Sequence, residues 1–240
     1  MRDQTEKLKR IRESCDLCGG TGLAARSLET GVKLDDCACV KRVGREIALI
    51  KANIQERYRD FDLRNITRDF EKNNKTSLQA IKDYGERITE NVRSGKSLWM
   101  HSGPGLGKSS LISWILKRAI DAGHVAYCIR ASHLLKTKLE GLKNPESKEL
   151  VDYLIDTVDI LAIEEIEKVY LTGHEDFIPA LFFEFLSDVY DSKKAILLSS
   201  NLPIDEVIIS LPLYIQDRLS AVQGIRFVGK SERVNIESFS

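Results

Sequence analysis

The feature that most constrains this chain is a glycine-rich loop between an apolar segment and an amphipathic helix. The loop reads Ser-Gly-Pro-Gly-Leu-Gly-Lys-Ser over residues 102–109. Leu-Trp-Met precedes it at 98–100, and apolar residues recur at helical spacing from Leu111 to Ile120. This order of strand, turn and helix predicts a phosphate-binding loop, in which main-chain N–H groups and the positive helix end face phosphate oxygens. A glycine-rich turn that only opens a helix is the alternative.

The loop predicts a site for ATP or a close analogue. We expect the nucleotide to be bound by Gly103, Pro104, Gly105, Leu106, Gly107, Lys108, Ser109 and Ser110. Lys108 is expected to reach the β- and γ-phosphates, and the Ser109 hydroxyl to bind Mg²⁺. Ser102 departs from the usual pattern, because a glycine normally occupies that position.

Alternation of strand-like and helix-like segments predicts an α/β fold with a parallel five-stranded sheet flanked by helices. The expected strands are 98–100, 125–129, 159–163, 195–199 and 225–228. We expect a helix over 42–59, a linker over 60–75, and a further helix over 78–92. Thr76 and Gln79 have the spacing of a capping box for that helix, and Gly95 is suited to end it.

Polar residues follow two of the expected strands. Glu164 and Glu165 end an apolar run, and Asn201 follows the next one. In a nucleotide hydrolase, the first carboxylate holds Mg²⁺ and the second orients or deprotonates the attacking water. Asn201 is expected to hydrogen-bond that water or the γ-phosphate. The alternatives are two exposed glutamates and a turn asparagine.

Four of the five cysteines lie close together in the sequence: Cys15, Cys18, Cys37 and Cys39. The first pair is followed by glycines in the pattern C-x-x-C-x-G-x-G, and the second pair has the spacing C-x-C. These spacings predict a structural Zn²⁺ site with four thiolate ligands and no open position. Redox-active thiols are the alternative interpretation.

The composition is that of an ordinary globular protein, with 42% apolar and 30% charged residues. Lys and Arg number 36 and Asp and Glu also number 36, so the formal net charge is zero. No apolar segment is long enough to cross a bilayer, and the N-terminus lacks the apolar region of a signal peptide. We therefore expect a cytoplasmic protein without a membrane partner.

The chain resembles the AAA+ ATPases, and among them the DnaC-type helicase loaders and the related IstB-type transposition ATPases. The residues that carry the resemblance are the loop 103–109, the box 163–166, and the segments 199–203, 217–219 and 229–233. The resemblance implies that Asn201 is the sensor 1 residue, Arg218 the arginine finger and Arg233 the sensor 2 residue. By the same resemblance, Lys108, Glu165, Asn201, Arg218 and Arg233 form the catalytic set.

The resemblance further implies an ATPase that binds a hexameric replicative helicase and helps place it on single-stranded DNA. Nucleotide-dependent homo-oligomers are implied as well. Lys136, Lys138 and Lys143 are candidate DNA contacts, with a solvated helix face as the alternative. Two residues depart from the pattern of these families: Glu164 stands where Asp is usual, and Val189 where Arg is frequent. Both departures bear on the rate of ATP hydrolysis.

We expect a zinc-binding, partner-binding module over 1–45, a helical connector and linker over 46–75, and an AAA+ domain over 76–240. Two other functions stay open. One is a transposition helper that acts on a transposase and duplex DNA, although the neutral charge speaks against many phosphate contacts. The other is a zinc-module adaptor with a weak ATPase.

Overall fold

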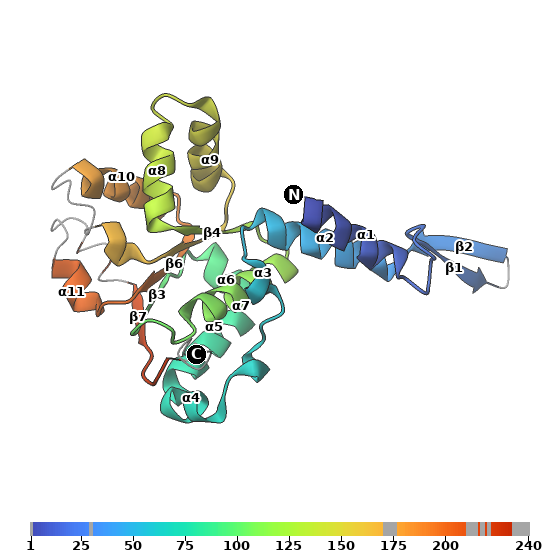
Figure 1. Ribbon diagram of the computed structural model, residues 1–240, viewed down its shortest axis with the longest axis horizontal. Coiled ribbons are helices and arrows are strands. Elements are labelled where there is room, and N and C mark those ends of the chain that lie inside the picture. The colour runs from blue at the N-terminus through green and yellow to red at the C-terminus, as the bar shows by residue number, and fades with distance from the viewer. Residues whose placement is uncertain are drawn as a thin grey trace, which may run out of the picture. The chain divides into compact units, whose positions relative to one another are not determined.

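The computed structural model describes residues 2–28, 31–169, 177–209, 216, 219 and 222–231. The chain divides into two compact units, Met1–Lys51 and Ala52–Ser240 (Figure 1). Among the residues just given, no helix is both long enough and apolar enough to cross a bilayer.

The first unit consists of two helices and a hairpin. Its elements are α1 (Arg2–Glu13), β1 (Leu23–Leu28), β2 (Gly31–Asp36) and α2 (Ala38–Lys51). The two strands pair antiparallel, with Leu23 opposite Asp36. Helices α1 and α2 contact each other, and the buried cysteines form a small cluster of their own.

The second unit is built on a parallel five-stranded sheet. The strands are β3 (Leu98–His101), β4 (Ala126–Arg130), β5 (Ile160–Glu164), β6 (Ala195–Ser200) and β7 (Gln223–Arg226). Their order is β4-β5-β6-β3-β7, and each neighbouring pair is parallel. Strands β5 and β6 are buried at every position, as is usual for parallel strands that helices cover on both faces. The five expected strands are confirmed to within two residues.

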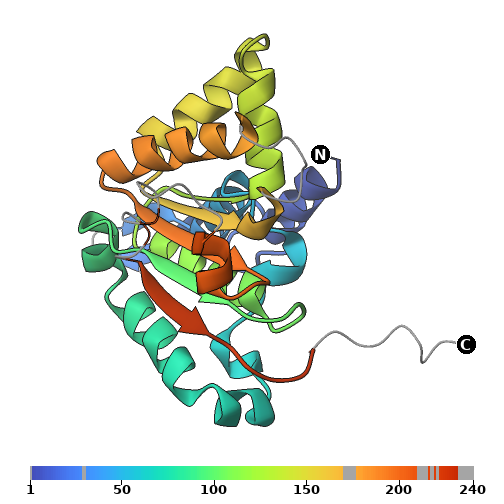
Figure 2. The same ribbon diagram turned by 90° about the vertical axis from the view of Figure 1, so that its left-hand side faces the viewer.

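Helices cover both faces of the sheet. The helical elements of the second unit are α3 (Glu56–Arg59), η1 (Leu63–Asn65), α4 (Arg68–Asn73), α5 (Lys75–Glu86), α6 (Ile88–Arg93), α7 (Lys108–Asp121), α8 (Ala131–Glu140), α9 (Pro145–Asp156), η2 (Ile166–Val169), α10 (Phe177–Asp191) and α11 (Ile204–Ile209). Helix α7 packs on β4, β5 and β6 and also contacts α5 and α6. Helices α8 to α10 pack together on the side opposite α4 and α5 (Figure 2).

Two of the expected helices are shorter than the sequence pattern indicates. The helix expected over 42–59 is α2, which ends at Lys51, followed by the separate short helix α3. The helix expected over 78–92 breaks at Arg87 into α5 and α6. The break is stabilised by the Asn91 side chain, whose Nδ2 donates to Tyr84 O at 3.0 Å. Gly95 follows α6 with φ +67°, as expected of a glycine that ends a helix.

The capping box expected at Thr76 and Gln79 is wrong. Helix α5 begins after Asn74, which makes no side-chain cap, and Gln79 instead donates to Asp83 at 2.7 Å. The Asn74 side chain is used elsewhere, because it exchanges two hydrogen bonds with the main chain of Val228 at 2.8 Å. The side chain at the N-cap position of α5 is therefore used in a long-range contact with Val228 and does not cap the helix.

The segment expected as a linker, residues 60–75, is folded. It contains η1 and α4, and Phe70 of α4 stacks on Phe227 with ring centroids 5.9 Å apart. The chain divides after Lys51, so residues 52–75 belong to the second unit. The polar composition of this segment predicts a linker. The segment is folded because Phe70 packs on Phe227, which directly follows β7.

The carboxyl ends of three central strands meet at one edge of the sheet. His101 at the end of β3 lies opposite Ser200 at the end of β6, and Ile163 of β5 lies opposite Leu198 of β6. The segments that come after β3, β5 and β6 therefore leave the sheet side by side. In open α/β sheets this edge is where ligands bind.

Candidate active site and metal centre

The glycine-rich loop joins β3 to α7 and has the conformation that phosphate binding needs. Gly105 and Gly107 have φ of +80° and +75°, a region that favours glycine, and Gly107 is the N-cap of α7. A Cβ added at Gly103 or Gly107 would meet no atom within 4 Å, so the space before the loop is open. The N-terminus of a 14-residue helix faces this space with its main-chain N–H groups.

Lys108 is buried and is held by four acceptors. Its Nζ, with three N–H donors to share, lies within hydrogen-bond distance of Ser102 O and Ser102 Oγ at 2.9 Å, Gly103 O at 3.1 Å and Asn201 Oδ1 at 3.0 Å. Ser102, the departure from the usual loop pattern, thus contributes a hydroxyl acceptor that glycine lacks. The ammonium lies between the loop and the end of β6, where a phosphate group would need a cation.

The second carboxylate of the acidic pair, Glu165, lines the same cavity as the loop residues Gly105 to Ser110, which we call the nucleotide cavity. Its backbone has φ +59°, an uncommon conformation for a residue with a side chain, and its N–H donates to Ser199 Oγ at 3.3 Å. Strained backbone of this kind clusters at functional sites. Glu165 Oε2 accepts from Lys168 Nζ at 2.6 Å, so the carboxylate is bound by a cation in this structure.

The first carboxylate, Glu164, lines a neighbouring cavity with Ser113 and Cys128. Its side chain is buried, and Oε1 has no hydrogen-bond partner within the described ranges. Burial and, after it, the Glu164 charge raise the pKa of the Cys128 thiol in this cavity. A buried carboxylate oxygen without a donor suits a cation such as Mg²⁺. Ser109 lines the nucleotide cavity instead, so the pairing of Ser109 with Glu164 around Mg²⁺ stays a prediction.

Asn201 connects the loop to a residue that no sequence motif predicts. Its Oδ1 accepts from Lys108, and its Nδ2 donates to Glu167 Oε1 at 2.6 Å. Glu167 lies in η2, directly after the acidic pair, and is buried. The third glutamate of Glu-Glu-Ile-Glu is the signal that could have identified it. Arg218 and Arg233, the expected finger and sensor 2 residues, lie outside the described residues.

The nucleotide cavity has a volume of ≈ 250 Å³ and an unexpected wall. Besides the loop, Glu165, Ser199 and Asn201, it is lined by Arg57 and Tyr58 of α3. The Arg57 guanidinium lies 4.6 Å from the centre of the Tyr58 ring. No motif marks these two residues in the sequence, and only the fold brings α3 to the loop.

An apolar cavity adjoins the nucleotide cavity at Leu106, Gly107 and Ser110. Its walls include Phe61, Ile66, Phe70 and Leu111, and its volume is ≈ 130 Å³. Aromatic and aliphatic side chains beside a phosphate-binding loop suit a flat nucleobase. Phe61, Ile66 and Phe70 belong to residues 60–75, the segment for which the sequence predicts a linker.

Of the three candidate DNA-binding lysines, two are in ion pairs. Lys136 Nζ lies 3.7 Å from Glu140, and Lys138 Nζ lies 3.0 Å from Glu184. Lys143 is exposed. A DNA phosphate would have to compete with a carboxylate at the first two, so their role in DNA binding stays a prediction.

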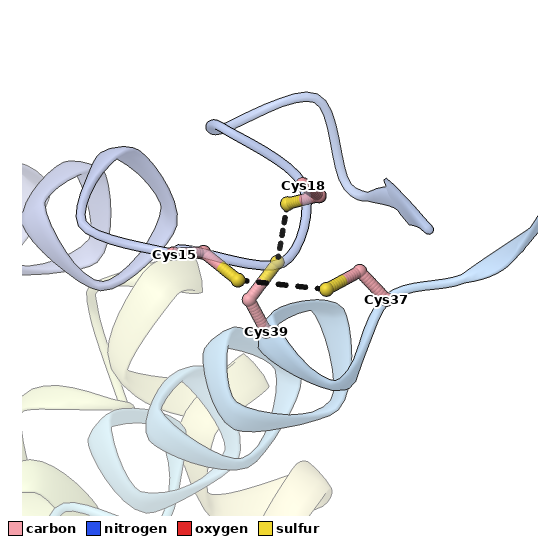
Figure 3. Close-up of side chains that lie close together, drawn as sticks. All are labelled: Cys15, Cys18, Cys37 and Cys39. Carbon is pink, nitrogen blue, oxygen red and sulfur yellow. Dashed lines mark hydrogen bonds between the residues drawn. The ribbon is translucent and has the colours of Figure 1, made fainter. Parts of the chain in front are cut away.

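In the first unit, the four expected cysteines come together (Figure 3). Their sulfur atoms all lie within 4.8 Å of one another, with Cys15 and Cys37 at 3.5 Å and Cys18 and Cys39 at 3.4 Å. Tetrahedral zinc with Zn–S bonds of about 2.3 Å holds sulfurs about 3.8 Å apart, so this donor set fits a Cys₄ zinc site.

The glycines after Cys18 act as the sequence predicts. Gly19, Gly20 and Gly22 all have positive φ, and the Gly22 N–H points at Cys18 Sγ at 3.3 Å. Cys37 follows β2 and Cys39 lies in the first turn of α2. The hairpin β1–β2 thus returns the chain so that the second pair completes the cluster.

Comparison with known proteins decides the family. The sequence matches the family described as the bacterial DnaA ATPase domain over residues 70–221. The chain belongs to this family. No curated protein matches it.

Solved structures give the same fold. The replication initiator DnaA bound to AMPPCP and single-stranded DNA is 17% identical, with a TM-score of 0.57 over 74% of this chain and 51% of that one. The DnaC helicase loader is 17% identical, with a TM-score of 0.55 over 72% of this chain and 100% of that one. DnaI is 15% identical, with a TM-score of 0.58 over 72% of this chain and 94% of that one.

This chain thus spans about half the length of the DnaA chain it matches. The expected AAA+ fold and the expected ATPase class are confirmed by the DnaA ATPase-domain match and these neighbours. The family is DnaA-type, whereas the resemblance in the sequence points first to DnaC-type loaders. Those loaders are structural neighbours of this DnaA-type domain.

Proposed function

We propose that this ATPase uses ATP as a conformational timer while it helps place a hexameric replicative helicase on single-stranded DNA during replication initiation. The observation that carries the ATPase part is the convergence of Lys108, Glu165 and Asn201 at one sheet edge. The loader part is supported by a four-cysteine unit that precedes the ATPase domain in the sequence. It is also supported by fold neighbours whose names are DnaA, DnaC and DnaI.

In this proposal each residue of the cavity has one task. The loop Gly103–Ser110 binds the phosphates, and Lys108 exchanges its acceptors in Ser102 and Gly103 for phosphate oxygens. Glu165 orients or deprotonates the attacking water once its carboxylate is released from Lys168. Ser109 and Glu164 hold Mg²⁺, which neutralises phosphate charge when it is bound.

Two arginines and the assembly complete the proposal. Arg218 reaches the γ-phosphate of a neighbouring subunit, and Arg233 acts as sensor 2 within its own subunit. ATP would then stabilise a homo-oligomer that ADP loosens, which makes hydrolysis a switch between two states. Single-stranded DNA and the helicase are the partners of the ATP-bound state. The protein is expected in the cytoplasm.

The cysteine unit is proposed to bind Zn²⁺ through Cys15, Cys18, Cys37 and Cys39 and to hold the partner helicase. Zinc supplies folding energy to this small unit, because its own cluster of buried side chains is made of the cysteines themselves. The proposed organisation keeps a partner-binding module over 1–45, a connector over 46–75 and an ATPase domain over 76–240. The structure adds that residues 52–75 pack within the second unit.

The test uses turnover and partner capture together. Lys108→Ala is expected to abolish ATP binding, and Glu165→Gln to retain ATP while stopping turnover. Glu149→Gln, an exposed change on α9, is the matched control for charge loss.

The Glu165→Gln protein, with ATP and zinc, is then mixed with a purified replicative helicase and, separately, with a transposase. If the protein captures the helicase and the Cys37→Ser variant does not, the loader function is supported. If it captures the transposase alone, the function is that of a transposition helper.

A zinc-module adaptor with a weak ATPase is the second candidate. The observation that favours it is Glu164, which lines the neighbouring cavity and not the one with Ser109. ATP turnover that is measurable and lost in Glu165→Gln would exclude this candidate. Helicase capture that is independent of ATP would favour it.

A further inference from the structure

The Asn201 side chain lies between one group that can only donate and one that can only accept. An ammonium has three N–H donors and no acceptor, whereas a carboxylate has acceptors only. Lys108 Nζ lies 3.0 Å from one end of the amide, and Glu167 Oε1 lies 2.6 Å from the other. The chemistry therefore allows a single orientation, with the amide oxygen toward Lys108 and the amide nitrogen toward Glu167.

Glu167 is placed to enforce this orientation. It is 5% exposed, and the Asn201 amide is the one partner of its carboxylate among the residues that the structure describes, since Oε2 has none there. Element η2, which carries Glu167, follows Glu165 directly and contacts β6, which ends just before Asn201. A buried carboxylate that serves one amide is costly to keep, which points to a positioning role.

We infer that Glu167 is a positioning residue that keeps the Asn201 amide oxygen, and not its nitrogen, on the side of Lys108 and the nucleotide cavity. Asn201 then acts as an acceptor toward Lys108 and the attacking water. A donor role toward the γ-phosphate, which is itself an acceptor, is thereby disfavoured. The inference rests on the proposed role of Asn201 in hydrolysis and specifies which atom performs it.

Single variants test the positioning role. Glu167→Ala removes the acceptor, so kcat is expected to fall about 10- to 100-fold, the range typical when a supporting hydrogen bond is lost, with KM for ATP changed little. Glu167→Gln keeps an acceptor oxygen, so kcat should stay within about 3-fold of the wild type. Glu149→Ala, exposed on α9, is the control, and tryptophan-fluorescence melting of each variant reports folding.

A double variant tests the orientation itself. Asn201→Asp keeps an oxygen toward Lys108 but sets a second carboxylate oxygen against Glu167, so turnover is expected to collapse. Adding Glu167→Gln supplies a donor for that oxygen, and the double variant is expected to recover to within about 10-fold of the wild-type kcat. This comparison stays informative even if Glu167→Ala fails to fold, because both members keep the side-chain volume.

The outcomes separate the inference from the function on which it rests. If Asn201→Ala hydrolyses ATP at the wild-type rate, the proposed role of Asn201 is wrong. If Asn201→Ala is inactive while Asn201→Asp with Glu167→Gln is no better than Asn201→Asp alone, the amide nitrogen is the working group and the inference is overturned. Recovery in the double variant supports the acceptor role.

Discussion

Lys117 anchors the wall of the nucleotide cavity, and its replacement should show how much that anchor contributes. It lies on α7, is 6% exposed, and donates to Arg59 O at 2.9 Å, to Tyr58 O at 3.3 Å and to Phe61 O. These carbonyls belong to the segment that presents Arg57 and Tyr58 to the cavity. Lys117→Met keeps most of the length of the apolar stem and removes every donor of the ammonium.

The expected cost depends on the burial of the three acceptors. Arg59 O is buried with its donor and loses about 1–3 kcal/mol when left without one. The other two bonds are partly buried, so water replaces the ammonium there at a cost of about 0.5 kcal/mol each. Removing the ammonium also recovers part of its desolvation cost. The net loss of unfolding free energy is therefore about 2–3 kcal/mol, which corresponds to about 4–12 °C in melting temperature for a domain of this size.

Tryptophan fluorescence measures this unit alone, because the two tryptophans of the chain, Trp99 and Trp114, both lie in it. Thermal melts of Lys117→Met are compared with Lys136→Met, whose side chain is 71% exposed in a pair with Glu140. ADP affinity is expected to fall as well, since the wall that carries Arg57 is loosened. A melting temperature equal to that of the Lys136→Met control would refute the reasoning that these carbonyls need Lys117.

Two further perturbations have defined outcomes. Removing the proposed zinc with a chelator should unfold the cysteine unit and expose residues 1–51 to protease, because a metal supplies much of the folding energy of so small a unit. The melting temperature measured by tryptophan fluorescence should stay unchanged. Freshly purified reduced protein with less than about half an equivalent of zinc would contradict the zinc site. Gly95→Ala would place a Cβ 2.7 Å from Lys193 O at a residue with φ +67°, and should lower the free energy of unfolding by about 2–3 kcal/mol. Gly123→Ala is the control: its φ is +87°, but its Cβ would meet open space, and the loss should be about 1 kcal/mol. Equal melting temperatures for the two alanine variants would show that the contact with Lys193 is relieved at no cost.

The parts of the site that the sequence predicts are those that short segments encode. Three glycines at fixed spacing before Lys108 set the loop conformation, and an apolar run before each polar end sets a strand and the position of the polar residues at its exit. Cys18 with its three glycines likewise forms its turn locally, as the positive φ of Gly19, Gly20 and Gly22 shows. These features depend on backbone preferences and hydrophobic periodicity, both of which are properties of neighbouring residues.

A contact between distant segments explains one expectation that is wrong, and a local contact explains another. Asn74 lies in the expected linker, yet it binds Val228, because β7 lies beside α5. Gln79 does not form the expected capping box because its side chain donates to Asp83, four residues further along the same helix.

By itself, the sequence determined the glycine-rich loop between a strand and a helix, the positions of the five strands and the two cysteine pairs, because each of these depends on residues a few positions apart. The tertiary structure alone decided that Arg57 and Tyr58 line the cavity, that Lys117 donates to the carbonyls of Tyr58, Arg59 and Phe61, and that Glu167 orients Asn201. The hydrogen bonds of Lys117 and of Glu167 join residues 34 to 59 positions apart. Strand order determines which of the many polar side chains meet, and strand order is a property of the whole packed sheet.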